Sequence, residues 1–457
     1  MSDDIGAPTR HPIPWHEPDF YDKDKLDSEL RRVFDICHGC RRCFNLCDSF
    51  PRLFDLVDEA EDMELEGVDS KDFKKVSDAC TLCDLCFMTM CPYTPPHEWN
   101  IDFPHLMLRY RAVEKNEGKT LTSASPRISE IDSNGRLARF LGPIMNWAID
   151  NQNSFSRSIL EKFAGIDRKA TLPKFQKKTL VSKSKKSVTE VNVEAPANGR
   201  KAVLYATCFS NFHNSSIGES ALKVLKYNGV DVEVVYPRCC GMPQLEQGDI
   251  KRVADNAAKT AKELVEWVDK GYDVIAVVPS CALMIKLEWP LIIPNDPNIL
   301  RLAENSYDIT EYIVDISRKE GLIDGLDPLE GGITLHMACH ARAQNMGRKA
   351  ADMLKLVPET NIDIIERCSG HGGSIGATKD FHDIAIKVGR PVARQSTQKN
   401  NKYISSECPL ASAHILEGMS ILAEKEKIDK YAGDIKPYAY HPIELLAIAY
   451  GLDKANI

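Results

Sequence analysis

The stretch CHGCRRCFNLCDSF (residues 37–50) places four cysteines within eleven positions. A second stretch, CTLCDLCFMTMCP (residues 80–92), contains four more. Closely spaced thiols in a reducing compartment are kept for metal binding or redox chemistry rather than for disulfides. The two stretches therefore predict an inorganic cofactor in the first quarter of the chain.

The spacing of these thiols indicates which cofactor. The first run is C-x2-C-x2-C-x3-C and the second is C-x2-C-x2-C-x4-C-P. A triplet of this kind can wrap one face of a [4Fe–4S] cluster, and in two-cluster ferredoxins the fourth cysteine of each run binds the other cluster. Structural zinc is the alternative, but zinc sites usually use two separated cysteine pairs. We expect one cluster on Cys37, Cys40, Cys43 and Cys91, and a second on Cys47, Cys80, Cys83 and Cys86.

Two details depart from the usual ferredoxin run, although neither removes a ligand. Cys47 is followed by Asp48 instead of proline, and one extra residue precedes Cys91. The 32 residues between the runs exceed what a compact bacterial ferredoxin uses. This separation favours an α-helical two-cluster ferredoxin domain, which we place at residues 1–125.

Charge and hydropathy exclude several functions. The net charge of −8 argues against nucleic acid as the main partner. Residues 1–20 have no basic start and no apolar stretch, so we expect no secretory leader. No run of about 18 apolar residues is present, so we expect a cytoplasmic protein with no transmembrane segment. Seven acidic residues between Asp55 and Glu66 predict a solvated surface, with a docking site for a basic redox partner as the alternative.

The chain from about residue 200 onward alternates strand-like and helix-like patterns. Segment 250–268, for example, has a helical period of apolar residues. This alternation predicts an α/β domain with a largely parallel sheet. The predicted strands are 201–207, 230–237, 273–280, 332–338, 362–367 and 402–407.

Each predicted strand ends directly before a cysteine or with one residue between them. Because ligands bind beyond the carboxyl ends of strands in open α/β sheets, these thiols are expected to meet at one rim. The cysteines are Cys208, Cys239, Cys281, Cys339, Cys368 and Cys408, and Cys240 adjoins the second of them.

The pattern also repeats. YATCFSNF, YPRCCGMP and VPSCALM in the first half correspond to HMACHARA, IERCSGHG and SSECPLA in the second. The cysteines are spaced 31 and 42 residues apart in the first half, and 29 and 40 in the second. We therefore predict a duplicated cysteine-rich domain at residues 199–325 and 330–457.

Residues 126–198 lie between these parts and are predicted to form a helical connector followed by a Lys/Ser-rich linker. The linker is the run from 177 to 201, whose apolar content is low. The segment RLARFLGPIMNWAI (136–149) is interpreted as an ordinary core helix. A helix lying in a membrane interface is the alternative.

Taken together, these motifs resemble a family of iron–sulfur subunits. A two-cluster ferredoxin module followed by a duplicated C…CCG…C domain is similar to the iron–sulfur C subunit of anaerobic glycerol-3-phosphate dehydrogenase. It also resembles the heterodisulfide reductase B/D subunits and the glycolate-oxidase and lactate-utilisation iron–sulfur subunits. The similarity extends to IDRKATLPKF (166–175), ATCFSNFHN (206–214) and RCCGMP (238–243).

The resemblance implies metal ligands in the cysteine-rich copies, and the sequence keeps only some of them. Met284 replaces a thiol in the first copy, and Ser369 replaces one in the second. Four thiols can hold a third iron–sulfur cluster in copy one, whereas copy two has three. His340 and His371 are candidates to complete a Cys₃His set for zinc or iron, or are ordinary polar residues near a loop. The candidate ligands are Cys208, Cys239, Cys240 and Cys281 in copy one, and Cys339, Cys368, Cys408, His340 and His371 in copy two.

The glycines of GHGGSIG (370–376) invite a phosphate-loop interpretation, but no Lys-Ser/Thr pair follows them. We expect these glycines to permit tight turns and close packing around the cysteine site.

Two functions follow from the resemblance. The first is an electron-transfer subunit that passes electrons between a partner, a flavoprotein dehydrogenase, and quinone or another acceptor. No flavin or nicotinamide fingerprint is present, so the electrons must come from another protein. The second is a self-contained reductase that acts on a small substrate such as a disulfide; the missing thiols count against it. The resemblance also implies a peripheral position at the inner face of the cytoplasmic membrane.

Overall fold

The computed structural model describes residues 8–187, 189–426 and 438–455. The first seven residues of the segment inspected for a leader, and Val188 of the predicted linker, lie outside the described residues. No helix in the described ranges is long and apolar enough to cross a bilayer.

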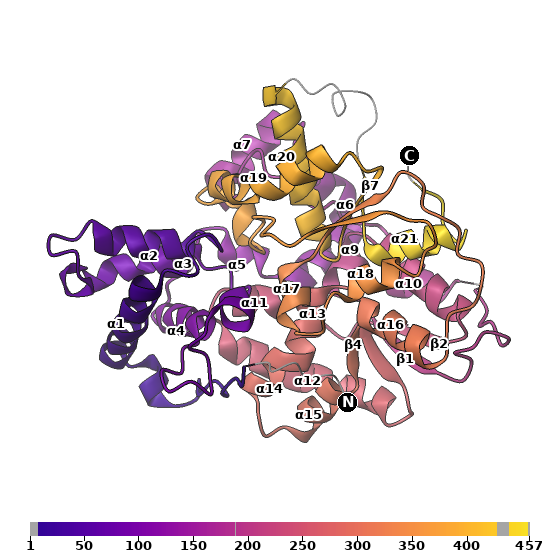
Figure 1. Ribbon diagram of the computed structural model, residues 1–457, viewed down its shortest axis with the longest axis horizontal. Coiled ribbons are helices and arrows are strands. Elements are labelled where there is room, and N and C mark those ends of the chain that lie inside the picture. The colour runs from indigo at the N-terminus through magenta and orange to yellow at the C-terminus, as the bar shows by residue number, and fades with distance from the viewer. Residues whose placement is uncertain (1–7, 188, 427–437, 456–457) are drawn as a thin grey trace.

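The amino-terminal segment is helical and lies at the left of Figure 1, in indigo and violet. The long first helix is amphipathic, buries Leu26, Leu30 and Phe34, and is capped by the Asp22 side chain. A π-helical turn, η4, separates the last two helices of the segment. The elements are η1 (Pro18–Tyr21), α1 (Lys23–Cys40), α2 (Ser49–Asp58), η2 (Leu65–Gly67), η3 (Ser70–Asp72), α3 (Phe73–Ala79), η4 (Cys86–Met90) and α4 (Phe103–Asn116).

The connector contains α5 (Ser125–Ile128), α6 (Ile131–Ile149), α7 (Ser154–Ala164) and α8 (Leu180–Ser184). The interpretation of 136–149 as a core helix is wrong. The segment lies in α6, whose buried residues are the small ones, while its large apolar residues face solvent. The predicted linker also contains ordered, packed structure, because Leu180 of α8 is fully buried.

Two four-stranded parallel sheets form the rest of the molecule, with strand orders β2-β1-β3-β4 and β6-β5-β7-β8. The six predicted strands all form, and the matching orders confirm the duplication. The central strands β1 and β5 are buried along most of their length, as expected for parallel strands covered on both faces. The strands are β1 (Lys201–Tyr205), β2 (Asp231–Val235), β3 (Asp273–Ala276), β4 (Ser306–Asp308), β5 (Ile333–His336), β6 (Ile362–Ile365), β7 (Tyr403–Ser406) and β8 (Ala439–Tyr440).

The fourth strand of each sheet was missed by the sequence analysis because β4 and β8 are very short. Each is followed at once by a helix with a capping box, formed by Asp308 and Glu311 in copy one and by His441 and Glu444 in copy two. The strands therefore end where the helix caps begin. The same local device at the same place is a further sign of duplication.

Helices cover both sheets. Those of copy one are α9 (Cys208–Phe212), α10 (Ser216–Tyr227), α11 (Met242–Leu245), α12 (Ile250–Val268), α13 (Pro279–Leu283), the π turn η5 (Met284–Glu288), α14 (Trp289–Ile292), α15 (Pro297–Glu304) and α16 (Ile309–Lys319). Those of copy two are α17 (Cys339–Ala343), α18 (Lys349–Leu354), η6 (Ile375–Ala377), α19 (His382–Lys399), α20 (Pro409–Glu426) and α21 (Pro442–Ala449).

The two copies meet mainly along three helix pairs, α10 with α21, α16 with α18 and α13 with α17. The last pair carries cysteines and lies close to the amino-terminal segment (Figure 1). The Ser280 hydroxyl and Nδ1 of His340 form a hydrogen bond across this contact, 2.8 Å long. The carboxyl ends of the strands in both copies are therefore turned toward each other and toward the amino-terminal cysteines.

Candidate metal centres

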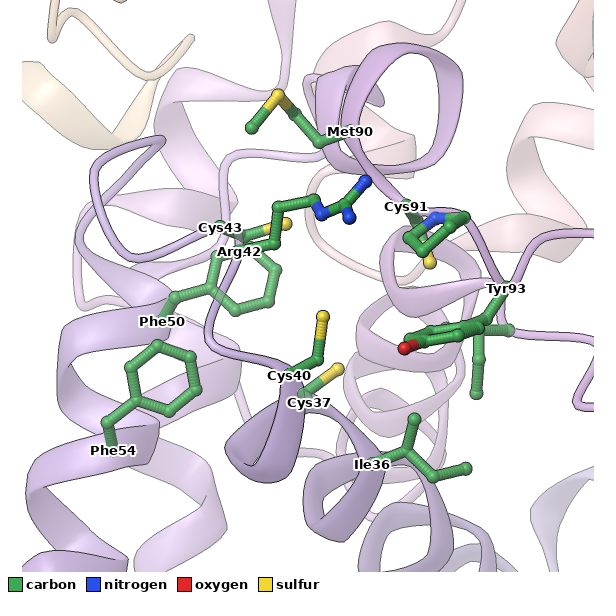
Figure 2. A pocket seen from close by; sticks show the side chains of 12 residues that line it. Ile36, Cys37, Cys40, Arg42, Cys43, Phe50, Phe54, Met90, Cys91 and Tyr93 are labelled. Carbon is green, nitrogen blue, oxygen red and sulfur yellow. The ribbon is translucent and has the colours of Figure 1, made fainter.

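Four amino-terminal thiols surround one pocket, shown in Figure 2. The pocket holds about 320 Å³ of empty space, part of it open solvent. Its walls are largely apolar and include Ile36, Phe50, Phe54 and Ile101. The sulfurs that line it belong to Cys37, Cys40, Cys43 and Cys91, the set expected from the spacing.

Local structure explains how these thiols come together. Cys37 and Cys40 lie on the last turn of α1, and Arg41 ends that helix in the left-handed conformation, with φ of 50°. The chain then turns so that Cys43 faces back toward the helix (Figure 2). Cys91 follows η4 and approaches from the other side of the pocket.

Burial and the proximity of neighbouring thiols raise the pKa values of three of these cysteines, Cys37, Cys43 and Cys91. Burial, followed by the neighbouring Cys91 and Cys43 thiols, raises the pKa of Cys37. Burial and Cys91 raise the pKa of Cys43 to about 12. Binding a metal cluster would displace the thiol protons, because the ligands are thiolates.

The other four amino-terminal thiols, Cys47, Cys80, Cys83 and Cys86, form a second group. Burial raises the pKa of Cys47, and the next largest causes are Cys83 and Cys80. The pKa of Cys86 is raised by burial and then by Cys83, Cys80 and Cys47. Cys43 of the first group also raises the pKa of Cys86, so the two groups are neighbours.

A buried arginine that sequence reasoning missed holds the second group in place. Arg111 of α4 is 3% exposed and donates hydrogen bonds to the carbonyl oxygens of Ser77 and Cys80. It also donates to the carbonyl of Glu246 in copy one, at 3.0 Å. One side chain thus ties the Cys80 loop to the cysteine-rich domain.

A buried charge cluster lies beside the same loop. The Arg10 guanidinium donates to Asp84 at 2.9 Å, to Asp102 at 2.8 Å and to Glu288 at 3.2 Å. His105 contacts the other oxygen of Glu288 at 3.2 Å. Asp84 lies between Cys83 and Cys86, so the cluster joins the second thiol group to α4 and to η5 of copy one.

The four cysteines of copy one, Cys208, Cys239, Cys240 and Cys281, also come together. The thiols of Cys208 and Cys240 hydrogen-bond Cys239 and lower its pKa well below its usual value. Cys240 in turn is hydrogen-bonded to Cys281. The fold therefore brings these four thiols to one rim, as predicted from the strand ends.

Neighbouring residues fix the geometry of the copy-one thiols. The Cys239 amide donates to Asp132 of α6 at 3.1 Å, and the Trp289 indole donates to the Cys240 carbonyl at 3.0 Å. Thr207, directly before Cys208, adopts a positive φ of 45°, which turns the chain sharply from β1 into α9. Met284, which replaces a family thiol, is fully buried.

The thiols of copy two lie beside the second amino-terminal group. Burial raises the pKa of Cys339, and the next causes are Cys83, Cys368 and Cys408. Burial and Cys368 raise the pKa of Cys83 to about 12. Nε2 of His371 lies 3.6 Å from the Cys408 sulfur.

The two candidate histidine ligands differ. Nδ1 of His340 bonds Ser280 and Nε2 lies 3.2 Å from the Leu82 carbonyl, so His340 bridges copy one, copy two and the second thiol group. Both ring nitrogens of His340 therefore have hydrogen-bonding partners in this structure. His371 accepts a hydrogen bond on Nδ1 from the Gly373 amide, 2.9 Å long. A neutral His371 therefore carries its proton on Nε2 and donates it toward Cys408.

The glycine loop makes close turns, as expected. Gly370, Gly372 and Gly373 have positive φ. A Cβ on Gly370 would lie 2.1 Å from the Ala385 carbonyl oxygen. The buried Glu246 carboxylate accepts hydrogen bonds from the Ser374 amide and hydroxyl, at 3.2 and 2.8 Å.

The donor sets suit iron–sulfur clusters, because each of the first three groups offers four cysteine sulfurs. Within the described ranges, no three His, Cys, Asp or Glu side chains converge closely enough to hold a single metal ion.

Comparison with known proteins identifies the carboxyl-terminal repeat. The family model of the CCG cysteine-rich domain matches residues 202–286 and 333–415. These ranges span the first three strands of each sheet and all seven cysteines of the repeat.

The chain is also similar to curated proteins. It is 28% identical over 242 residues to an uncharacterized iron–sulfur protein of Methanocaldococcus jannaschii, an alignment that covers 51% of this chain and 45% of the relative. It is 26% identical over 289 residues to the B subunit of fumarate reductase (CoM/CoB) of Methanothermobacter marburgensis, covering 60% and 53%. The chain thus spans about half the length of these two relatives.

A third relative is covered more fully. The chain is 30% identical over 183 residues to lactate utilization protein A of Bacillus pumilus, covering 38% of this chain and 74% of the relative. The repeated domain, the paired thiol groups and these relatives agree with one another. The chain belongs to the family of iron–sulfur redox proteins built on a duplicated CCG cysteine-rich domain.

Proposed function

We propose that this protein is the electron-transfer subunit of an oxidoreductase complex. Two [4Fe–4S] clusters occupy the amino-terminal thiol groups, with Cys91 and Cys47 exchanged between the two runs. A third cluster occupies the four cysteines of copy one. Iron–sulfur clusters of this kind, when bound, accept and release one electron at a time.

One observation carries the proposal: the two amino-terminal thiol groups and the thiols of copy two follow one another through the molecule. The Cys37 group adjoins the Cys86 group through Cys43, and Cys83 of the latter adjoins Cys368 of copy two. A protein that needed only a structural metal would have no reason to arrange its thiols in a series. Arg111 and the Arg10 cluster keep the middle group fixed against the cysteine-rich domain, and a fixed separation suits electron transfer.

The partner is proposed to be a flavoprotein dehydrogenase, and the acceptor quinone or another redox protein. The relative named as the B subunit of fumarate reductase (CoM/CoB) supports membership of a redox complex. All seven acidic residues from Asp55 to Glu66 are exposed close to α1 and the first thiol group, and they offer a docking surface to a basic partner. We place the protein peripherally at the inner face of the cytoplasmic membrane.

A self-contained reductase of a small disulfide is the second candidate. It is favoured by copy two, where three thiols and the Nε2–H of His371 lie beside Cys83. A disulfide bound there would need two electrons and two protons to become two thiols. Cys47, Cys80, Cys83 and Cys86 would hold the cluster that supplies the electrons one at a time, His371 would donate one proton and solvent the other. The absence of a fourth thiol in copy two suits an open site, but it also suits a copy that has lost its metal.

Stopped-flow mixing distinguishes the two candidates. The full chain, purified and reduced anaerobically with dithionite and freed of excess reductant, is mixed with menadione or with oxidised glutathione while cluster absorbance is followed. We expect reoxidation by menadione to be at least about tenfold faster. Equal or faster reoxidation by oxidised glutathione, with two thiols formed per disulfide, would replace the electron-transfer proposal with the reductase.

A further inference from the structure

The helices α6 and α7 display an apolar surface. Of the fifteen large hydrophobic side chains that are exposed in the described ranges, eight lie on these two helices, with exposed fractions of 42–83%. They recur at helical spacing, so each helix presents them on one face. They are Leu137, Phe140, Leu141, Ile144 and Trp147 on α6, and Phe155, Ile159 and Phe163 on α7. We call this surface the hairpin face.

An ordinary surface helix buries its large apolar side chains, whereas α6 exposes them and buries its small residues. The buried residues of α6 are Gly135, Ala138 and Gly142. A Cβ on Gly135 would lie 2.5 Å from the Phe212 ring of α9, so glycine is needed for the close approach. The helix buries its small side chains against the protein and directs Phe140 and its other large side chains outward. Large exposed apolar surfaces of this kind mark interaction sites.

The charges around the hairpin face are basic. Arg136, Arg139 and Lys162 are exposed and have no carboxylate partner among the described residues. The acidic residues nearby are already paired. Glu161 accepts from Nε of Arg168 at 2.7 Å, and Asp150 accepts from Lys174 at 2.8 Å. Asp132, at the start of α6, is bonded to Tyr236 and to the Cys239 amide.

We propose that the hairpin face lies on the surface of an anionic lipid membrane. Leucine, isoleucine, phenylalanine and tryptophan would enter the boundary between headgroups and acyl chains, and the unpaired Arg136, Arg139 and Lys162 would contact lipid phosphates. The unpaired basic residues favour an anionic lipid surface over a second copy of this chain as the partner of the hairpin face. A second copy of this chain, with its net charge of −8, would bring its own Arg136 and Arg139 against these.

The hairpin connects this surface to both cysteine-rich copies. α6 packs against α9 of copy one, and its Asp132 holds the Cys239 amide. At the other end, Ile166 pairs with Thr378 of copy two in a β-bridge. Membrane contact would therefore bring the copy-one thiols near the bilayer, where lipid-soluble quinones reside. This inference rests on the peripheral position proposed above, and it does not depend on the electron-transfer function.

Vesicle flotation tests the proposal. Full-length holoprotein is incubated with vesicles of phosphatidylcholine alone or with about 30% phosphatidylglycerol added. We expect flotation with the anionic vesicles and a blue shift of tryptophan fluorescence, both reduced by high salt. Phe140→Ser combined with Trp147→Ser should lower the partition coefficient at least about tenfold, since both side chains would lose buried apolar area. Unchanged cluster absorbance and circular dichroism would show that the variant folds.

Val193→Ser is the matched control, because Val193 is 70% exposed but lies outside the hairpin. It should float like the wild type. Equal flotation of wild type and the double variant would preserve a peripheral position and overturn the hairpin face as its cause. If the protein floats with neither kind of vesicle, both the peripheral position and the role of the hairpin face are wrong. The wild type could instead form a concentration-dependent dimer without floating, and the double variant could lose that dimer. This result would assign the hairpin face to a second copy and refute the proposal.

Discussion

Replacing Arg10 by methionine tests how the amino-terminal module is held to the cysteine-rich domain. Arg10 is the one cation that the structure places among Asp84, Asp102 and Glu288 in this cluster; only His105, whose charge depends on protonation, lies nearby. Its side chain is 11% exposed, and those of Asp84 and Glu288 are 6% and 3% exposed. Arg10→Met fills most of the same volume but leaves three carboxylates facing one another.

The loss of stability expected for Arg10→Met can be worked out from the pKa of Asp102. Although burial opposes ionisation, Arg10 and His105 lower this pKa from 3.8 to about 2. Such a shift corresponds to about 2 kcal/mol of stability above pH 4, which is lost as pH falls toward 2. Burial also opposes the ionisation of Glu288, but His105 and Arg10 lower its pKa. Asp84 would also be left buried without a cation beside it. We therefore expect Arg10→Met to lower the free energy of unfolding by about 3–5 kcal/mol at pH 7.

The pH dependence of this loss has a definite sign. Without Arg10, burial should raise the folded-state pKa values of Asp102 and Glu288 above their unfolded values, so ionisation at neutral pH would favour unfolding. The deficit of the variant should therefore be largest near pH 7 and should shrink as pH falls toward about 4.

Anaerobic urea unfolding of the holoprotein, followed by far-UV circular dichroism at pH 7 and pH 5, measures the loss. Arg32→Met is the matched control, because Arg32 pairs with Glu29 at the exposed surface, and we expect it to cost less than about 1 kcal/mol. A loss below about 1 kcal/mol for Arg10→Met, or a loss that does not decrease at pH 5, would refute the reasoning.

Two further substitutions test packing and the bridging histidine. Gly135→Ala should lower the free energy of unfolding in urea by about 1–3 kcal/mol, since its Cβ would meet the Phe212 ring. Gly142→Ala is the control and should be neutral or stabilising, because a Cβ there has nothing within 4 Å. Equal effects of the two substitutions would contradict this packing. His340→Phe should cost about 1–3 kcal/mol, because it leaves Ser280 and a backbone carbonyl without a partner, while the iron content per chain stays unchanged. A fall in iron content of this variant would instead make His340 a ligand.

The sequence predicted the parts of this molecule that are encoded locally. The six strands were found because each is a short apolar run that stops a few residues before a cysteine. The exchange of Cys47 and Cys91 between the two thiol groups was expected from spacing alone, and the structure places both thiols accordingly. Assignment of these groups to particular clusters stays a prediction, as do the domain boundaries.

What the sequence did not predict depends on partners distant in the chain. The exposure of Phe140 depends on whether another element covers α6, and the apolar period of the helix is the same in either case. His340 adjoins Cys339 in sequence, yet its ring points to Ser280 and Leu82, 60 and 258 residues away. Arg111 carries no motif, and only the folded chain shows that it fixes the Cys80 loop.

The most direct test of the account is the iron and acid-labile sulfide content of anaerobically purified protein, measured with zinc in the same sample. Two [4Fe–4S] clusters on the eight amino-terminal thiols predict about eight irons and eight sulfides per chain, and a third cluster in copy one raises each number to about twelve. Protein that contains neither iron nor sulfide, and instead binds stoichiometric zinc, would contradict the claim that these thiols carry electrons.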